Sequence, residues 1–270
     1  MRLVSFILMV FFSAACFAQT VFSGKVLDAS TKEPIPFVNV GIVGKNKGTV
    51  TDDQGRFSLE LPNELDNDTL RMSIIGYATR SWQVGQLKTH LQDSIITLEP
   101  ADHQLKQVEV HSKRMRKKVL GNKSTSEMFT GSFTTDELGN EVGVKIDVGK
   151  GPVYLQSFKF SIASNQCYDA VLRVNIYNIK EELPDSNLLP ANVVVSIPKK
   201  RGVIEVDLQP YQLVMSEDFI ISVEYIKPCP SRSMNFSAAF LGTIYSRTTS
   251  QGQWYSLKGF DLGFNVEVRY

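Results

Sequence analysis

The stretch GTVTDDQGRF, residues 48–57, decides how the N-terminal half of this chain folds. Its two adjacent aspartates are either an acid pair or the corner of a hairpin. Asp52 suits the first position of a turn, because its carboxylate accepts hydrogen bonds from nearby backbone amides. Gly55 reaches positive φ without a Cβ clash, as a four-residue hairpin loop requires near its end. A catalytic pair would need a nearby base or metal-ligand set, which the stretch lacks, so we predict a structural turn.

The segments on either side of this turn alternate apolar and polar residues. Residues 56–61, RFSLEL, place three apolar side chains on one face and three polar ones on the other. Residues 38–42 and 70–74 alternate in the same way, and turn-forming stretches such as TKEPIP and LPNELDND separate them. This pattern is typical of half-buried antiparallel strands. We predict about seven short strands between residues 22 and 98, arranged as a β-sandwich.

These motifs resemble the carboxypeptidase-regulatory-like domain, a transthyretin-type seven-stranded β-sandwich. The resemblance covers about residues 22–100 and rests on GKVLD, EPIPFVNV, GTVTDDQGRF and IIGY at matching spacing. The resemblance implies structural roles for these residues, and the family has no catalytic residues that could be assigned to this sequence. The same domain commonly precedes TonB-dependent receptors, but the rest of this chain is too short for their 22-stranded barrel. We therefore do not expect a transporter.

The second half of the chain also alternates with a period of two, in longer segments such as AVLRVNIY and DFIISVEYI. Eight or nine candidate strands in residues 139–270 predict a jelly-roll-like β-sandwich. We expect its charged side chains, including Arg173 and Glu224, on the outer, solvated faces. This half resembles uncharacterised all-β domains that accompany the N-terminal module. The predicted fold class is all-β, with two β-sandwich domains.

Between the two sandwiches, the segment HSKRMRKKVLGNKSTS is basic and polar and lacks an apolar stripe. We interpret it as part of a linker. Its basic cluster could contact phosphate or lipopolysaccharide head groups, or could simply be solvated. The cluster comprises Lys113, Arg114, Arg116, Lys117 and Lys118. The predicted divisions are a signal peptide at 1–18, the first sandwich at 19–100, the linker at 101–138 and the second sandwich at 139–270.

The first 18 residues follow the order of a secretory signal peptide: one positive charge, an apolar run, and small residues. The apolar run is too short to span a bilayer, which needs about 20 residues. We predict cleavage after Ala18, no transmembrane span, and a periplasmic or outer-membrane-associated protein. The alternative is a lipid anchor at Cys16, although Ser13 fits a lipoprotein signal poorly.

Two cysteines, Cys167 and Cys229, remain once the signal peptide is removed. Both fall in the second predicted domain, and an exported chain meets an oxidising environment. We therefore predict a disulfide between them. Two separate buried thiols are the alternative.

The composition excludes several classes of function. The formal charge of +1 falls to 0 when the single arginine of the signal peptide leaves, so we expect no nucleic-acid partner. His90, His103 and His111 are not accompanied by cysteines or carboxylates at metal-ligand spacing. The sequence contains no nucleophile elbow, phosphate loop or metalloprotease motif. We expect no metal, no cofactor and no catalytic residue.

One aromatic stretch, TSQGQWYSLKGFD, favours a binding role. Trp254 and Tyr255 could stack on sugar rings, or could cap the core of the second sandwich. We predict a non-catalytic, envelope-associated binding or assembly module whose partner is an envelope protein or a glycan. The alternatives are a glycan-binding module that uses these two aromatic residues, a hydrolase with an unrecognised site, and a small membrane barrel.

Overall fold

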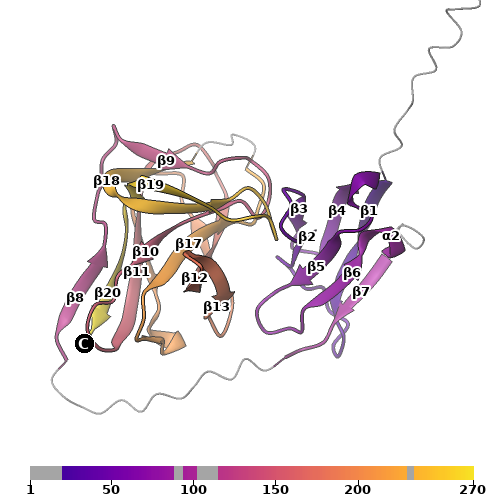
Figure 1. The fold of residues 1–270 in the computed structure, drawn as a ribbon, viewed down its shortest axis with the longest axis horizontal. Coiled ribbons are helices and arrows are strands. Elements are labelled where there is room, and N and C mark those ends of the chain that lie inside the picture. Colours follow the sequence, from indigo (N-terminus) through magenta and orange to yellow (C-terminus); the bar gives the residue numbers. More distant parts are fainter. Residues whose placement is uncertain (1–19, 88–93, 102–114, 230–233) are drawn as a thin grey trace, which may run out of the picture.

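The computed structural model describes residues 20–87, 94–101, 115–229 and 234–270, and they form two β-sandwich domains (Figure 1). The predicted all-β fold class is therefore confirmed. No helix in these ranges is both long and apolar enough to cross a membrane. The predicted signal peptide, Cys16 and the three histidines lie outside the described residues.

The N-terminal domain contains the seven strands that alternation predicted, in two sheets. One sheet has the order β4-β1-β7 and the other the order β3-β2-β5-β6. The pairing is antiparallel except between β1 and β7. A short 3₁₀ turn and one turn of helix α2 connect the strands. The elements are β1 Thr20–Asp28, β2 Asn39–Ile42, β3 Gly48–Val50, β4 Arg56–Leu61, η1 Asn63–Leu65, β5 Thr69–Ser73, β6 Arg80–Gln83, α2 Val84–Leu87 and β7 Ser94–Leu98.

Alternation along the strands supplies the core of this domain. In β4 every second side chain is buried, and the residues between them are exposed. Phe22 from β1 and Phe57 from β4 pack edge to face, with ring centroids 5.0 Å apart. Leu70 and Met72 of β5 are fully buried from the opposite sheet. The other face of β5 is left free to contact the second domain.

The C-terminal domain contains thirteen strands in two antiparallel layers, consistent with the jelly-roll-like prediction. A long strand, β18, pairs at its start with β9 and β11 in one layer and at its end with β10 in the other. The strands are β8 Lys117–Gly121, β9 Thr130–Ser132, β10 Glu141–Ile146, β11 Val153–Asn165, β12 Ala170–Lys180, β13 Leu183–Asn187, β14 Val193–Ile197, β15 Gly202–Asp207, β16 Val214–Met215, β17 Phe219–Tyr225, β18 Met234–Arg247, β19 Tyr255–Leu262 and β20 Phe264–Arg269; η2 spans Gln209–Tyr211.

Aromatic rings fill the space between the two layers. Phe158, Phe160, Phe236 and Phe264 pack edge to face, with ring-centroid separations from 5.3 to 6.2 Å. All four are fully buried. Edge-to-face contacts of this kind add to the stabilisation that burial of the rings provides.

The predicted linker at 101–138 is too long. Within it, β8 pairs with the last strand, β20, and β9 pairs with β18, so both belong to the C-terminal domain. The sequence shows little apolar stripe here because these are edge strands with few covered side chains. In β8 only Leu120 is buried.

The described part of the basic cluster lies at this edge. Lys117 forms an ion pair with Glu267 of β20, with an Nζ–Oε1 distance of 2.7 Å. The backbone N–H of Arg116 donates to the carbonyl of Tyr270 at 3.0 Å. Lys113 and Arg114 lie outside the described residues.

A disulfide joins Cys167 and Cys229, the two residues predicted to pair, with their Cα atoms 5.5 Å apart. It links the segment after β11 to the segment after β17. Both cysteines are buried in the C-terminal core.

The two domains contact each other through the outer face of the β3-β2-β5-β6 sheet. Gly41 and Gly48 lie on this face, and a Cβ at either would overlap the carbonyl oxygen of Ser250. The glycines therefore allow the loop between β18 and β19 to lie directly on the sheet. The N–H of Gly44 donates to the carbonyl of Gln251 at 2.9 Å. Ile75, beyond β5, packs against the C-terminal core.

Candidate functional site

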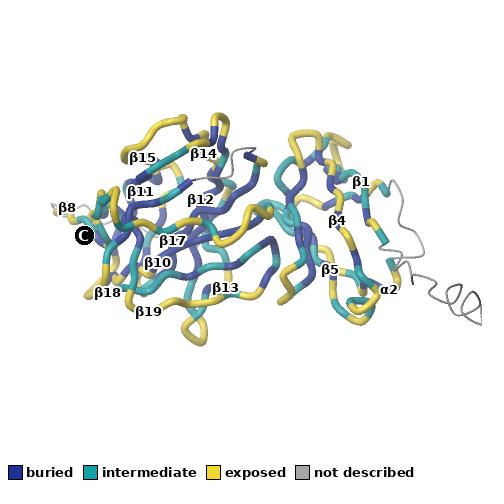
Figure 2. Tube along the Cα trace, turned by 90° about the horizontal axis from the view of Figure 1, so that it is seen from above, coloured by how far each residue is buried: buried dark blue, intermediate teal, exposed yellow. Residues whose placement is uncertain are grey.

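Charged side chains are buried on the face of β10, β12 and β17 that points away from the C-terminal core. In β12, Leu172 and Val174 belong to the core, so Arg173 between them points to the opposite side. Arg173 is 2% exposed, and both Glu141 of β10 and Glu224 of β17 are 0% exposed. Figure 2 shows these strands as buried in the middle of the domain. The prediction of a solvated outer face is therefore wrong for Arg173 and Glu224.

The buried charges form two close ion pairs. Arg173 donates from Nε and Nη2 to Oε2 of Glu224, each at 2.8 Å. Nη2 of Arg247, from the end of β18, lies 2.6 Å from Oε2 of Glu141 and 3.8 Å from Oε1 of Glu224. Neutral groups complete the set: Asn175 donates its amide to both glutamates, at 2.9 Å each. We call these five residues the buried charge cluster.

Two hydroxyl groups also donate to Glu141: those of Ser222 and of Tyr177, the latter at 3.3 Å. Burial and the neighbouring Glu224 carboxylate raise the pKa of Glu141 against the opposing effect of Arg247. Burial has the same effect on Glu224, but Arg173 and Arg247 outweigh it and hold its pKa below the usual value. Glu224 is therefore the more firmly ionised of the two carboxyls, and Glu141 keeps a proton to higher pH.

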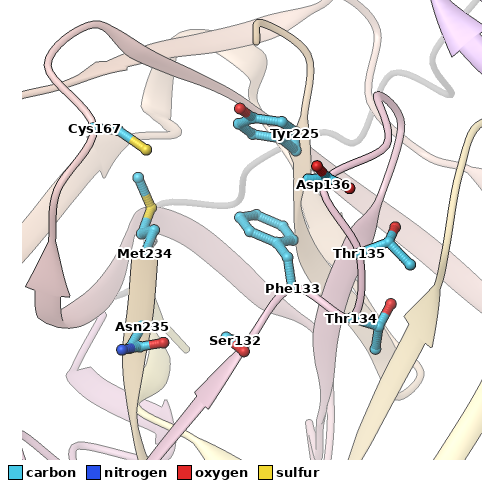
Figure 3. Close-up of a pocket in the computed structure, with 9 residues that line it drawn as sticks. All are labelled: Ser132, Phe133, Thr134, Thr135, Asp136, Cys167, Tyr225, Met234 and Asn235. Carbon is cyan, nitrogen blue, oxygen red and sulfur yellow. The ribbon is translucent and has the colours of Figure 1, made fainter. Parts of the chain in front are cut away.

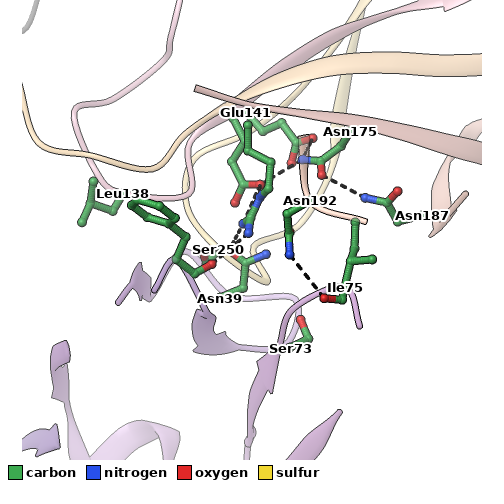
Figure 4. A network of polar contacts seen from close by, with 12 residues as sticks. Asn39, Ser73, Ile75, Leu138, Glu141, Asn175, Asn187, Asn192 and Ser250 are labelled. Carbon is green, nitrogen blue, oxygen red and sulfur yellow. Dashed lines mark hydrogen bonds and ion pairs between the residues drawn. The ribbon is translucent and has the colours of Figure 1, made fainter. Parts of the chain in front are cut away.

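The N-terminal domain completes the coordination of this cluster. Arg173 donates from Nη1 to the carbonyl of Phe37 at 2.8 Å and from Nη2 to Oδ1 of Asn39 at 2.6 Å. Ser250 donates to the same Asn39 oxygen at 2.9 Å, and Gln251 donates to Ser73 at 2.8 Å. Figure 4 shows side chains of both domains meeting at this point. The guanidinium of Arg173 therefore links the buried charge cluster of the C-terminal domain to the N-terminal domain.

A cavity of about 400 Å³ lies beside the cluster, between the two domains. Three residues that line it each contain one buried polar atom without a hydrogen-bond partner among the described residues: Nε of Arg71, Nε of Arg247 and Oδ1 of Asn192. The amide of Asn192 donates to the carbonyl of Ile75 at 3.3 Å, which fixes its orientation (Figure 4). Buried polar atoms without partners are uncommon and costly, so the hydrogen bonding of this wall is incomplete in the described structure.

A second cavity, of about 270 Å³, lies next to Cys167 in the C-terminal domain (Figure 3). Phe133, Tyr225 and Met234 form part of its wall, together with the hydroxyl groups of Thr134 and Thr135. The ring of Phe133 packs 5.6 Å from that of Tyr225. Its lining combines apolar surface with hydroxyl groups and the carboxylate of Asp136.

The predicted turn lies at an exposed corner, and Asp52 borders a third, open cavity of about 450 Å³ that Ile226 and Lys227 also line. Oδ1 of Asp52 accepts from the backbone N–H groups of Gln54 and Arg56, each at 2.8 Å. Gly55 has a φ of 71°, and a Cβ there would lie 2.6 Å from the carbonyl oxygen of Val26. These contacts account for both residues by backbone geometry.

The two aromatic residues predicted to stack on a ligand differ in their surroundings. Trp254 packs edge to face on Tyr177, with ring centroids 5.6 Å apart, and the guanidinium carbon of Arg247 lies 5.0 Å from the Trp254 ring centroid. Trp254 therefore adjoins the buried charge cluster. Tyr255 is 46% exposed and starts β19. The structure does not present the two rings as one platform.

Metal-binding groups are not gathered in the described ranges, where no three His, Cys, Asp or Glu side chains stand close enough to hold an ion. The residues that sequence reasoning missed are those of the buried charge cluster. One signal was present in the alternation of β12 and β17. Tyr177 lies on the same face of β12 as Arg173, and Ile220 lies on the same face of β17 as Glu224. Large apolar residues on a face that carries charges indicate that this face is covered.

The fold and this site define a two-domain all-β protein with a polar cavity between its sandwiches. Residues 22–110 match the family model of the CarboxypepD_reg-like domain, so the N-terminal domain is of that family, as the sequence resemblance predicted. The match ends before β8, and the C-terminal domain lies outside it. No curated protein matches the sequence significantly.

Similarity to solved structures is weak. The chain holding the cysteine protease and lectin-like domains of Cwp84, a surface layer associated protein of Clostridium difficile, has 12% identity and a TM-score of 0.41; the alignment covers 57% of this chain and 36% of that one. The VP2 chain of the infectious bursal disease virus subviral particle has 10% identity and a TM-score of 0.30, with 92% and 62% covered. This chain thus spans less than two thirds of either protein.

Proposed function

We propose that this protein is an exported, non-catalytic binding module of the cell envelope, which holds its ligand or partner between its two sandwich domains. The observation that carries the proposal is the interdomain cavity, which is lined by residues whose hydrogen bonding is incomplete within the described structure. The export signal in the sequence supports an envelope location. Clefts between domains are frequent sites for ligand binding.

The arrangement of the two glutamates supports a non-catalytic role over a hydrolase. A pair of carboxyl groups with pKa values shifted apart is a common feature of hydrolytic sites. Here, however, Glu141 and Glu224 are fully buried and bonded to arginine and asparagine side chains, and neither contributes to the cavity wall. They hold the arginines in place, and Oε1 of Glu224, which has no hydrogen-bond partner among the described residues, is itself buried away from solvent.

A glycan-binding module centred on Trp254 and Tyr255 is less well supported. The Trp254 ring already contacts Tyr177 and Arg247, so one of its faces is occupied. Tyr255 alone offers an exposed ring. Sugar binding in the interdomain cavity needs neither residue.

A ligand screen with a cavity-filling variant tests the proposal. The melting temperature of the full two-domain protein is measured by circular dichroism with a panel of sugars, sugar acids, sugar phosphates and peptidoglycan fragments. We expect at least one compound to stabilise the wild type but not Asn192→Phe, which fills the cavity. Val194→Phe, two residues along the chain at an exposed position, is the matched control and should behave as the wild type.

Two results would contradict the proposal. The first is that no compound stabilises the wild type, or that every stabilising compound acts equally on Asn192→Phe. The second is chemical conversion of a bound compound, detected by mass spectrometry after incubation, because a binding module returns its ligand unchanged.

A further inference from the structure

We propose that the interdomain cavity binds a hydroxylated monocarboxylate, the chemistry of a sugar acid, through Arg71 and Arg247. The inference rests on the proposed function above and names the ligand class for that same site. It follows from three features of the cavity: an arginine without an ion pair among the described residues, a second arginine held rigid by the buried charge cluster, and a hydrogen-bond acceptor that no described group satisfies.

Arg71 supplies the uncompensated charge. It lies on β5 between the fully buried Leu70 and Met72, so its side chain points away from the N-terminal core and onto the cavity wall. Its Nε atom is buried, and its guanidinium makes no ion pair or side-chain hydrogen bond in the described part of the chain. Because the charge of Arg71 has no counter-charge among the described residues, an anionic ligand is favoured at this position.

Arg247 supplies a second donor whose position is already fixed. Its side chain is 9% exposed and is held on one side by Glu141 and on the other by the ring of Trp254. Its Nε atom is buried without a partner among the described residues, and the residue lines the same cavity. A donor that is immobilised before binding loses little conformational entropy when a ligand arrives.

The balance of charge favours a monoanion. Arg173 and Arg247 are matched by Glu224 and Glu141, which leaves Arg71 as the arginine of this wall without an ion pair among the described residues. Asp185, the remaining carboxylate at the wall, is exposed and accepts from Ser186 Oγ at 3.0 Å. A carboxylate matches one unpaired guanidinium in charge and in its planar, two-pronged geometry. A phosphate monoester would bring a second negative charge close to Asp185.

The remaining groups call for hydroxyls on the ligand. Oδ1 of Asn192 is a buried acceptor without a partner in the described part of the chain, and it needs a donor that a bare carboxylate lacks. Ser186, Asn187 and Gln251 line the same cavity and add further polar contacts. A volume of about 400 Å³ lies in the range of sites for small molecules, which suits a sugar ring.

Titration calorimetry with three matched sugars tests the inference: D-glucuronate, neutral D-glucose, and the dianionic D-glucose 6-phosphate. With the full two-domain protein at low salt, we expect D-glucuronate to bind at least about tenfold more tightly than either of the others. Arg71→Gln should lose that preference, because it removes the unmatched charge. Arg56→Gln, an exposed arginine of the same domain, should leave the binding of all three sugars unchanged.

The control for folding is direct. Arg71 makes no ion pair or side-chain hydrogen bond with described residues, so Arg71→Gln should unfold at the same denaturant concentration as the wild type. Equal affinity for D-glucuronate and D-glucose, a preference for the phosphate, or an Arg71→Gln variant that binds as the wild type would each overturn the inference. If another compound of the screening panel binds the wild type and not Asn192→Phe, the proposed function stands and only the carboxylate chemistry fails. If nothing in the panel binds, both fail.

Discussion

Two carboxylate–arginine pairs in this molecule show how burial changes the weight of one interaction. Asp52 and Arg56 are four residues apart on an exposed turn, with a 3.0 Å ion pair. Glu224 and Arg173 are 51 residues apart and buried, with two 2.8 Å contacts. Water solvates both partners of the exposed pair, so removing one costs little. Neither partner of the buried pair can be solvated, so each depends on the other.

The strongest test of this difference is Arg173→Met. It leaves Glu224 buried without its main counter-charge, and we expect the free energy of unfolding of the C-terminal domain to fall by about 3–5 kcal/mol. Each domain has one tryptophan, so denaturant unfolding followed by Trp254 in a Trp82→Phe background reports this domain alone. The double variant Arg173→Met, Glu224→Leu removes both charges and should recover much of the loss. A single-variant loss below about 1 kcal/mol would show that the pair is not the determinant we describe.

The exposed turn could be predicted from the sequence, and the buried cluster could not. The hydrogen bonds that Asp52 accepts lie within five consecutive residues, Asp52 to Arg56, so residue type alone predicts these contacts. The cluster draws Glu141, Arg173 and Glu224 from three strands. Alternation correctly placed Arg173 on the face opposite the core. It could not show that a second domain covers that face, because the covering residues lie more than a hundred positions away.

The same reasoning explains the error in the linker. Edge strands such as β8 and β9 have few buried side chains, so they carry little of the periodicity that identifies a strand. Their pairing with β20 and β18 comes from backbone hydrogen bonds, which any residue except proline can make. The core strands, which bury a whole face, were the ones that the pattern identified.

Moving the loop of residues 248–252 away from the N-terminal domain should let water reach the buried charge cluster, so that the buried ion pair contributes less to stability, as the exposed pair does. In Gly41→Ala, the new methyl group overlaps the carbonyl oxygen of Ser250, so the loop of residues 248–252 must move away. We expect this crowding to weaken domain contact by about 1–3 kcal/mol. Faster hydrogen exchange at the loop amides, with unchanged melting of the N-terminal domain, is the expected result. Lys45→Ala, an exposed change in the same hairpin, is the control.

The effect of Gly41→Ala should also be coupled to that of Arg173→Met. Once water reaches the pair, Arg173→Met in the Gly41→Ala background should cost less than it does alone, because the changes act on one network and are not additive. Strict additivity of the two losses would mean that the loop does not exclude water from the pair.

Asp261 lies between the two extremes, since it is partly buried and has no arginine partner in the described structure. Burial raises its pKa to about 6, against the opposing hydrogen bond from the N–H of Leu262. The folded state therefore holds this proton more tightly than the unfolded state. The stabilisation is complete below about pH 3.8 and is lost as the pH rises through about 6.

Asp261→Asn removes this titration while keeping the acceptor oxygen. Because the group is partly solvated, we expect the variant to gain only about 1 kcal/mol over the wild type at pH 7, and little at pH 4. Urea unfolding from pH 4 to 8 measures the difference. A difference that stays constant across this range would show that Asp261 does not titrate within it.

The smallest effect is expected at the exposed pair. Asp52→Ala removes two local backbone hydrogen bonds and the ion pair to Arg56, and should cost the N-terminal domain about 0.5–1 kcal/mol, measured by Trp82 in a Trp254→Phe background. Despite some burial, its hydrogen bonds and Arg56 lower the pKa of Asp52, so this contribution is present above about pH 3.8 and is lost as the pH falls. Asp52→Asn keeps the acceptor and removes the charge; because water screens the ion pair, it should retain most of the stability. If Asn is as harmful as Ala, the ion pair and not the turn dominates, and the contrast with the buried pair weakens.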